Sequence, residues 1–202
     1  MSQWRSLNEP WRVAFEQAII AYLQRASAPI GAVVVDERGD VVARGANDFS
    51  SNRLAHAEMA ALSQVPSGAE RSTYEIYSIL EPCPMCTGAI RMCQLRAVHF
   101  AAVDPSAGST AFFDANDFMR EFPCSVHPPQ DLELEHVVVA LVVEFRIRTG
   151  HHRWQERWLR YHPAGAELGA RLASTNSYGA WTKSPPSAAQ IYDQLASSNL
   201  AA

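Results

Sequence analysis

The chain has 202 residues, of which 48% are hydrophobic and 19% are charged, with a formal net charge of -4. This length and composition can bury a sizeable core, which excludes disorder throughout and indicates one compact domain with a short extension. The absence of an apolar run of about 18 residues or more excludes a membrane span, and with no basic leader it favours a soluble cytoplasmic protein. The acidic balance gives no global sign of a phosphate-binding surface.

The first third of the chain shows a helical pattern, then two strand patterns, then a second helical pattern. The predicted elements are a helix over 11–24, a β-hairpin of strands 31–35 and 41–44, and a helix over 54–62. Ala28-Pro29 ends the first helix, because the residue before a proline avoids the helical conformation. Ser51 or Asn52 is expected to cap the second helix, which would carry His56 and Glu58 in its first turns.

The rest of the chain begins with a βαβ pattern, which predicts a parallel strand pair. The predicted elements are a strand over 73–80, a helix over 86–94, a strand over 97–103, a helix over 112–122, and a fifth strand over 132–139 that runs into a helix over 142–147. Residues 151–161 are amphipathic, and a loosely ordered tail rich in Ser, Ala and Pro is expected from Ser174. These patterns divide the chain into a domain over 1–150 and an extension over 151–202.

Two short motifs carry metal chemistry. One is His56-Ala57-Glu58, and the other is Pro82-Cys83-Pro84-Met85-Cys86 at a strand end. Together they form the H-x-E and P-C-x-x-C signature of zinc deaminases. Two cysteines and one histidine leave a fourth zinc position for water, which is typical of catalytic rather than structural zinc. We therefore expect one catalytic Zn²⁺ per chain, held by His56, Cys83 and Cys86.

Glu58 is the predicted catalytic residue. It lies two residues beyond His56, which turns it away from the metal-facing direction and keeps it near the open position. From there its carboxyl can take a proton from the attacking water and pass protons to the ring nitrogen and the leaving amine.

Each motif also has a structural interpretation when it is taken alone. A His-Ala-Glu tripeptide is common in Ala-rich helices, and a lone Cys-x-x-Cys also occurs in structural zinc sites and redox pairs. Their conjunction, in the expected order of elements, favours the deaminase interpretation. The other histidines lack comparable spacing and are expected to be surface or core residues: His99, His127, His136, His151, His152 and His162. Cys93 is expected to pack, and Cys124 to lie in a loop.

With these motifs, the sequence resembles the cytidine deaminase superfamily, in the branch of bacterial guanine deaminases and tRNA adenosine deaminases. The similarity covers about residues 11–141 and is most specific in the metal motif with the following Gly88-Ala89-Ile90. Further matching segments are 29–35 and 45–47. The resemblance implies a three-layer α/β/α fold with a five-stranded mixed sheet, in a protein that forms a homodimer.

The resemblance also implies substrate-binding positions. Asn47 would hydrogen-bond the base, the backbone N–H of Ala57 would contact its carbonyl or ring edge, and Glu81 would support the metal motif. Taken alone, Asn47 is more typical of a simple loop residue.

The same resemblance bears on the choice of substrate. The second proline of the metal motif and the segment Phe112-Phe113-Asp114 are closer to guanine deaminases than to the tRNA enzymes. Phe113 and Asp114 would then approach the purine, with the carboxylate accepting from ring N–H groups. Asp114 as the cap of a helix beginning near Ala115 is an almost equal alternative. Asp117 is a weaker substrate candidate.

A basic cluster in the last quarter of the chain keeps tRNA open as a substrate. The cluster is interleaved with Trp154 and Trp158 and comprises Arg146, Arg148, His151, His152, Arg153, Arg157 and Arg160. An ordinary amphipathic helix, with both tryptophans packed inward and the arginines solvated, is the favoured interpretation of this segment.

The sequence therefore favours a zinc-dependent deaminase of a free purine or related amino-heterocycle. A tRNA adenosine deaminase that makes inosine is the alternative, and a non-catalytic zinc-stabilised interaction module is the least favoured hypothesis.

Overall fold

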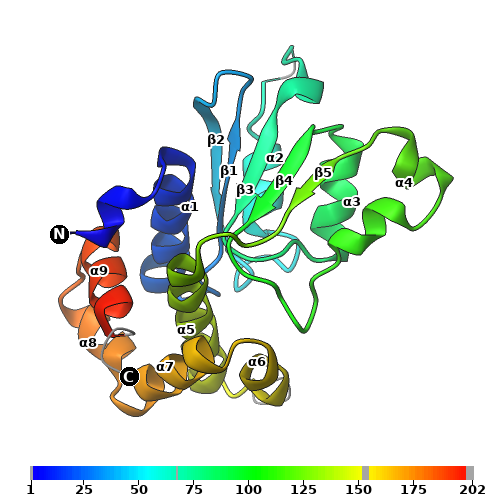
Figure 1. Cartoon of the computed structure of the whole chain (residues 1–202). Helices are drawn as coiled ribbons and strands as arrows, with labels where there is room; N and C mark the ends of the chain where they lie inside the picture. Colours follow the sequence, from blue (N-terminus) through cyan, green and yellow to red (C-terminus); the bar gives the residue numbers. More distant parts are fainter. Residues whose placement is uncertain (1, 67, 152–154, 199–202) are drawn as a thin grey trace.

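A five-stranded mixed sheet lies at the centre of the molecule, with helices on both faces (Figure 1). The computed structural model describes residues 2–66, 68–151 and 155–198. The strands are β1 (Gly31–Val35), β2 (Val41–Ala46), β3 (Glu75–Ser78), β4 (Ala97–Phe100) and β5 (Ser125–His127). The helices are α1 (Glu9–Ile19), α2 (Ala57–Leu62), α3 (Pro84–Met92), α4 (Asp117–Glu121), α5 (Leu132–Arg148), α6 (Gln155–Tyr161), α7 (Pro163–Ser174), α8 (Ser177–Lys183) and α9 (Ala188–Ser198). A π-helical turn extends α1 over Ile20–Gln24, and 3-10 turns cover Gln3–Ser6, Arg71–Thr73 and Thr110–Asp114.

The strand order is β2-β1-β3-β4-β5. β1 pairs antiparallel with β2 and β3, whereas β3–β4 and β4–β5 are parallel. The predicted hairpin and βαβ unit are therefore confirmed. Because β3 and β4 are parallel, their carboxyl ends meet at one edge of the sheet, where the segments after Ser78 and Phe100 begin.

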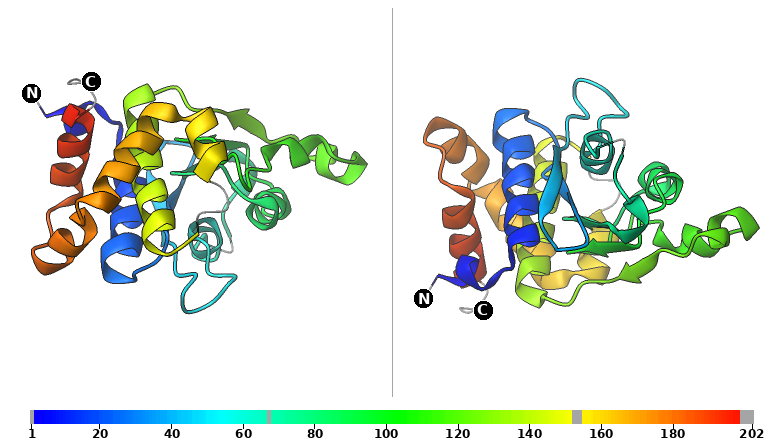
Figure 2. Two further views of the ribbon diagram at one scale, coloured as in Figure 1. Left: turned by 90° about the horizontal axis from the view of Figure 1, so that it is seen from below. Right: turned by 90° about the horizontal axis from the view of Figure 1, so that it is seen from above.

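Side-chain alternation along the strands builds two cores, one on each face of the sheet. Val33 of β1 belongs to the core shared with α1, α5 and α9, whereas its neighbours Ala32 and Val34 belong to the core under α2 and α3. Figure 2 shows the resulting layers, with α1 on one side of the sheet and α2 and α3 on the other. The expected three-layer arrangement is confirmed.

Gly45 of β2 allows α2 to lie directly on the hairpin. A Cβ atom at this position would collide with backbone atoms of Ala57 and Ala61. The close approach fixes the start of α2, and therefore Ala57 and Glu58, against the sheet.

The fifth strand is not where the sequence pattern predicted it. Residues 132–139 belong to the single helix α5, and β5 lies earlier, at Ser125–His127. The side chain of Asp131 accepts hydrogen bonds from the N–H groups of Glu133 and Leu134 and so caps the helix. The continuous apolar run that follows is buried on all sides, and periodicity alone cannot distinguish such a helix from a buried strand.

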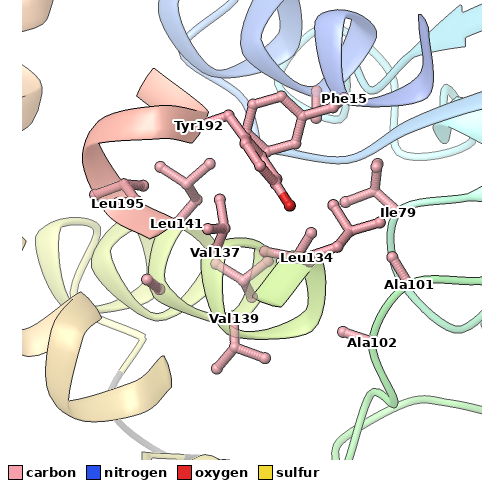
Figure 3. Close-up of a cluster of buried hydrophobic side chains, with 14 of the residues drawn as sticks. Phe15, Ile79, Ala101, Ala102, Leu134, Val137, Val139, Leu141, Tyr192 and Leu195 are labelled. Atoms are coloured by element: carbon pink, nitrogen blue, oxygen red, sulfur yellow. The ribbon is translucent and has the colours of Figure 1, made fainter. Parts of the chain in front are cut away.

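The segment over 174–198 is largely helical, whereas the sequence pattern predicted a loose tail from Ser174. It forms α8 and α9, and α9 runs beside α1 (Figure 2). Its buried residues Tyr192 and Leu195 join Phe15, Leu134 and Leu141 in one core (Figure 3). The carboxylate of Asp193 also accepts from Trp4 N at 2.8 Å and Ser2 Oγ at 2.7 Å. The extension therefore shares its core with the deaminase domain expected over 1–150.

Within these described residues, no helix combines the length and apolarity needed to cross a bilayer.

The packing of α9 predicts that Leu195→Ala destabilises the whole protein. Leu195 is 1% exposed, so its loss should lower the free energy of unfolding by about 2–5 kcal/mol. The exposed neighbour Gln194 is the matched control, and Gln194→Ala should change stability by less than about 0.5 kcal/mol. Urea unfolding followed by circular dichroism measures both. Equal stability of the two variants would contradict the packing of α9.

Candidate metal centre and substrate cavity

Three donor atoms form a small triangle at the carboxyl edge of the parallel strands. The Sγ atoms of Cys83 and Cys86 are 3.6 Å apart, and His56 Nδ1 lies 3.5 Å from Cys83 Sγ and 3.6 Å from Cys86 Sγ. Ligands of tetrahedral zinc, bound at about 2.0–2.3 Å, lie about 3.4–3.8 Å from one another. The triangle therefore has the size of one face of a zinc tetrahedron. In the described part of the chain, it is the one group of His, Cys, Asp and Glu side chains that meets the spacing for a metal ion.

Two helix starts bring these ligands together. Cys83 is the N-cap of α3, Pro84 is its first residue, and Cys86 lies in its first turn. His56 is the N-cap of α2 with an extended backbone, so it precedes the helix in which the sequence pattern had placed it. Asn52, one of the expected caps, instead accepts from Leu54 N within the preceding loop. The N-terminal dipole of α3 favours thiolates at this position.

The three side chains of the triangle shift one another's pKa values. Hydrogen bonds from Cys86 and His56 lower the pKa of Cys83 to about 4, even though its burial acts in the opposite direction. The contact with Cys83 raises the pKa of His56, and the contact with Cys83 together with burial raises the pKa of Cys86. A bound cation replaces these protons, because thiolate and neutral imidazole are the forms that bind zinc.

Glu58 lies beside the triangle and is 3% exposed. Its Oε1 accepts a hydrogen bond from Ser78 Oγ at 3.1 Å, and its Oε2 accepts from Cys86 Sγ at 3.4 Å. Burial raises the pKa of this carboxyl, which favours the protonated form. Ser78 ends β3, so the carboxylate is held by the sheet as well as by α2. The arrangement suits a group that accepts and returns a proton at the metal.

A cavity of about 310 Å³ opens onto the triangle and Glu58. This volume is at the lower end of ligand sites and suits a single base or nucleoside. Its walls are Ala28, Ile30, Asn47, Phe49, His56, Glu58, Leu80, Glu81, Cys83, Asp104, Ala107, Val142, Phe145, Arg146 and His151. Three segments remote in sequence therefore meet here: the end of the hairpin, the metal motif, and the C-terminal part of α5.

Two of the expected substrate-binding residues line this cavity. Asn47 is 2% exposed and donates from Nδ2 to Ser27 Oγ at 2.9 Å, which orients the amide. Glu81 accepts at Oε1 from Thr110 N at 3.1 Å and Thr110 Oγ1 at 2.7 Å, and so ties the loop after β4 to the metal motif. Ala57 is buried as the first residue of α2, where a helix leaves its N–H groups without intrahelical acceptors.

The structure does not bring Phe113 and Asp114 to the cavity. Phe113 is 5% exposed and packs in the core under α2 and α3, and Asp114 is exposed. Asp114 also does not cap a helix, because α4 begins at Asp117 and Asn116 accepts from Met119 N as its cap. The single helix expected over 112–122 is accordingly a 3-10 turn followed by α4. The residue that favoured a guanine-like base is thus absent from the cavity walls.

Sequence reasoning missed several cavity residues. Asp104 follows the carboxyl end of β4, next to the metal motif that follows β3, so the parallel pair could have indicated it. Phe145 lies on α5 and belongs to no motif, and Arg146 of the same helix was assigned only to the basic cluster, not to the site. Phe49 lies in the loop after β2 without a motif of its own.

The described members of the basic cluster differ in their environments. Trp158 is fully buried and Arg146 lies over its ring at 5.4 Å, whereas Arg160 is exposed. Arg148 donates to Glu144 and lies 3.5 Å from the Tyr178 ring centroid. His152, Arg153 and Trp154 fall outside the described residues.

Two other histidines and the two remaining cysteines lie outside the cavity wall. His99 stacks between Tyr77 and His127 on the sheet, and His162 pairs with Glu135 at 3.2 Å. Cys93 and Cys124 are partly buried free thiols.

Comparison with known proteins identifies the family. The cytidine and deoxycytidylate deaminase zinc-binding region matches residues 6–102. The chain is 36% identical over 104 residues to the tRNA-specific adenosine deaminase of Rickettsia bellii (strain RML369-C), a match that covers 48% of this chain and 71% of that protein. The chain belongs to this deaminase family. With its His56, Cys83 and Cys86 cluster, it binds one zinc ion.

Two further similarities bear on fold and substrate. The guanine deaminase of Bacillus subtilis (strain 168) is 36% identical over 92 residues, which cover 43% of this chain and 58% of that protein. A structure solved in work on A-to-I editing by tRNA:A34 deaminases at the wobble position of transfer RNA has a TM-score of 0.53 and 31% identity, and the match covers 59% of this chain and 95% of that one.

The donor triangle predicts that Cys83→Ser removes most of the zinc from the purified protein. The wild-type chain should carry about one ion, because two thiolates and an imidazole converge on it, and loss of one thiolate weakens the site strongly. Cys93→Ser is the matched control and should retain the metal. Inductively coupled plasma mass spectrometry gives the stoichiometry. Full zinc content in Cys83→Ser would contradict the assignment.

Proposed function

We propose that the protein is a zinc-dependent hydrolytic deaminase that converts adenosine to inosine in tRNA. The observation that carries the reaction is the buried carboxylate of Glu58 beside the triangle of His56, Cys83 and Cys86, at a cavity sized for one base. The buried position of Glu58 beside the metal ligands argues against a non-catalytic zinc-stabilised module, because such a module does not need a carboxylate there.

In the proposed reaction, the carboxyl of Glu58 carries out the proton transfers of deamination. His56, Cys83 and Cys86 would hold the zinc ion, which would supply an acidified water molecule, because coordination can lower the pKa of water from about 16 to about 7. Glu58 takes a proton as the water attacks C6, and a C–O bond forms. The carboxyl would pass this proton to the ring nitrogen, then take the remaining hydroxyl proton and pass it to the amine, so that the C6–N bond breaks and ammonia leaves. The raised pKa of Glu58 suits it to hold a proton between these transfers.

Residues beside the metal site are proposed to orient the substrate. In this proposal, the Asn47 amide and the Ala57 N–H hydrogen-bond the base, while Glu81 holds the loop at Thr110 in place. Leu80 and Phe145 provide apolar contacts with the ring faces.

Two observations favour tRNA over a free base. The R. bellii protein named as a tRNA-specific adenosine deaminase is matched over 71% of its length. In addition, Phe49 in the cavity wall is 44% exposed, and the guanidinium of Arg53 lies 5.4 Å from its ring centroid. Exposed aromatic rings beside arginines stack unpaired bases of single-stranded nucleic acid, which suits the neighbours of an extruded nucleotide.

A free guanine-like purine is the second candidate. The cavity volume and the similarity to the B. subtilis guanine deaminase favour it, whereas the position of Asp114 gives it no support. The homodimer expected from the family resemblance stays a prediction.

The substrate is tested by a panel assay with the zinc-loaded protein. We expect inosine in digested tRNA after incubation, detected by liquid chromatography and mass spectrometry, and little ammonia from guanine. Ammonia release from guanine or another free base, with unmodified tRNA, would establish the second candidate instead.

The role of Glu58 predicts that Glu58→Gln lowers turnover by about 100-fold or more, because general acid–base transfer contributes about 10²–10⁴ in rate. Zinc content should stay near that of the wild type, since Glu58 lies outside the donor triangle. Single-turnover inosine formation and metal analysis measure the two quantities. Normal turnover in Glu58→Gln would exclude this carboxylate as the proton carrier.

A further inference from the structure

An arginine on α5 lies in the cavity wall, and the residues that the structure describes give its guanidinium no hydrogen-bond acceptor. The side chain of Arg146 is 24% exposed, and the residue lines the same cavity as Glu58 and the metal ligands. Among the residues that the structure describes, its interactions are an ion pair and a ring contact. Its guanidinium N–H groups are therefore available to a ligand in the cavity.

The neighbours of Arg146 hold it in place but leave its charge incompletely paired. Asp104 Oδ2 is 3.9 Å from Nη2, beyond hydrogen-bond distance, and Asp104 Oδ1 is occupied by the N–H groups of Ser106 and Ala107. The ring of Trp158 supports the guanidinium at 5.4 Å. Burial lowers the pKa of Arg146, and Asp104 counteracts this in part.

Arg148, two residues further along α5, has a hydrogen-bonded carboxylate partner, although its Nη2 is buried without a hydrogen-bond partner among the described residues. Its Nε donates to Glu144 at 3.1 Å, and its guanidinium packs on Tyr178. Burial of a cation is unfavourable unless an acceptor is supplied. Among the described residues, Arg148 therefore has a carboxylate within hydrogen-bond distance, whereas the nearest carboxylate oxygen to Arg146 is the one of Asp104 at 3.9 Å.

We propose that Arg146 binds a phosphate group attached to the target nucleoside and thereby selects phosphorylated substrates over free bases and nucleosides. This inference rests on the proposed deamination of a nucleotide within RNA. A guanidinium presents a planar fork of donors that matches phosphate oxygens. In the proposed function, Glu58 of α2 and Asn47 after β2 engage the base, so Arg146 on the separate helix α5 would meet another part of the nucleotide.

The kinetic test compares an anticodon stem-loop RNA, adenosine 5′-monophosphate and adenosine as substrates. Arg146→Gln should lower kcat/KM for the RNA by about 10- to 100-fold, mainly through KM, because a charge-assisted hydrogen bond is lost. Turnover of adenosine should change by less than about threefold. A loss shared by adenosine 5′-monophosphate identifies a phosphomonoester as a sufficient ligand, and a loss confined to RNA identifies the backbone phosphate.

Two further variants separate binding from folding and from general charge. Arg146→Lys keeps the charge and should recover part of the affinity. Arg160→Gln removes an exposed charge from α6 and should leave all three substrates unaffected. Equal losses on adenosine and RNA, or no loss on RNA, would overturn the assignment of Arg146.

Binding distinguishes this inference from the proposed function. In zinc-loaded Glu58→Gln protein, the affinity for the stem-loop should fall with salt, and Arg146→Gln should reduce the slope of log K against log salt by about 0.7 for one single-stranded phosphate contact. Wild-type protein that binds this RNA with the Arg146-dependent slope, yet makes no inosine, would refute only the proposed function. Inosine formation with an unchanged slope and KM in Arg146→Gln would refute only the phosphate contact.

Discussion

The convergence of two sulfurs and one imidazole nitrogen within 3.6 Å is the constraint on which the site depends. Its donors come from two segments that are 27 residues apart at their nearest ligands, so backbone features remote from the metal must bring them together. Pro84 starts α3 directly behind Cys83, and Gly45 lets α2 settle on the hairpin behind His56. The parallel pairing of β3 and β4 then aligns the segments that carry Glu81 and Asp104.

Local sequence was sufficient for this part of the molecule. The hairpin, the βαβ unit, the metal ligands and Glu58 follow from short motifs, because each turn or helix start is specified by residues within a few positions. The sequence pattern placed His56 inside the helix, whereas it is the N-cap of α2. The loop at Asn52 uses its side chain internally, and this delays the helix until Ala57.

The C-terminal third could not be predicted in the same way, because its structure depends on tertiary burial. The run Val137–Val139 has the composition of a strand, yet α5 is surrounded by α1, α7 and α9 and is stable as a buried helix. Gly169 of α7 lies so close to Ala140 and Val143 that a side chain there would clash, a contact that no local pattern reveals. Tyr192 and Leu195 likewise give order to a segment whose composition suggested a loose tail.

α5 has two functions along its length, since its first turns fill the core and its last turns form a wall of the cavity. Glu58, the proposed proton carrier, is on α2, and the metal ligands lie at the starts of α2 and α3. None of these residues is on α5. The proposed proton transfers and the α5 wall of the cavity therefore belong to different helices, whereas Ala57, proposed to contact the base, shares α2 with Glu58. We therefore expect substitutions at Phe145 and Arg146 to alter the shape and charge of the cavity without moving Glu58 or the metal ligands.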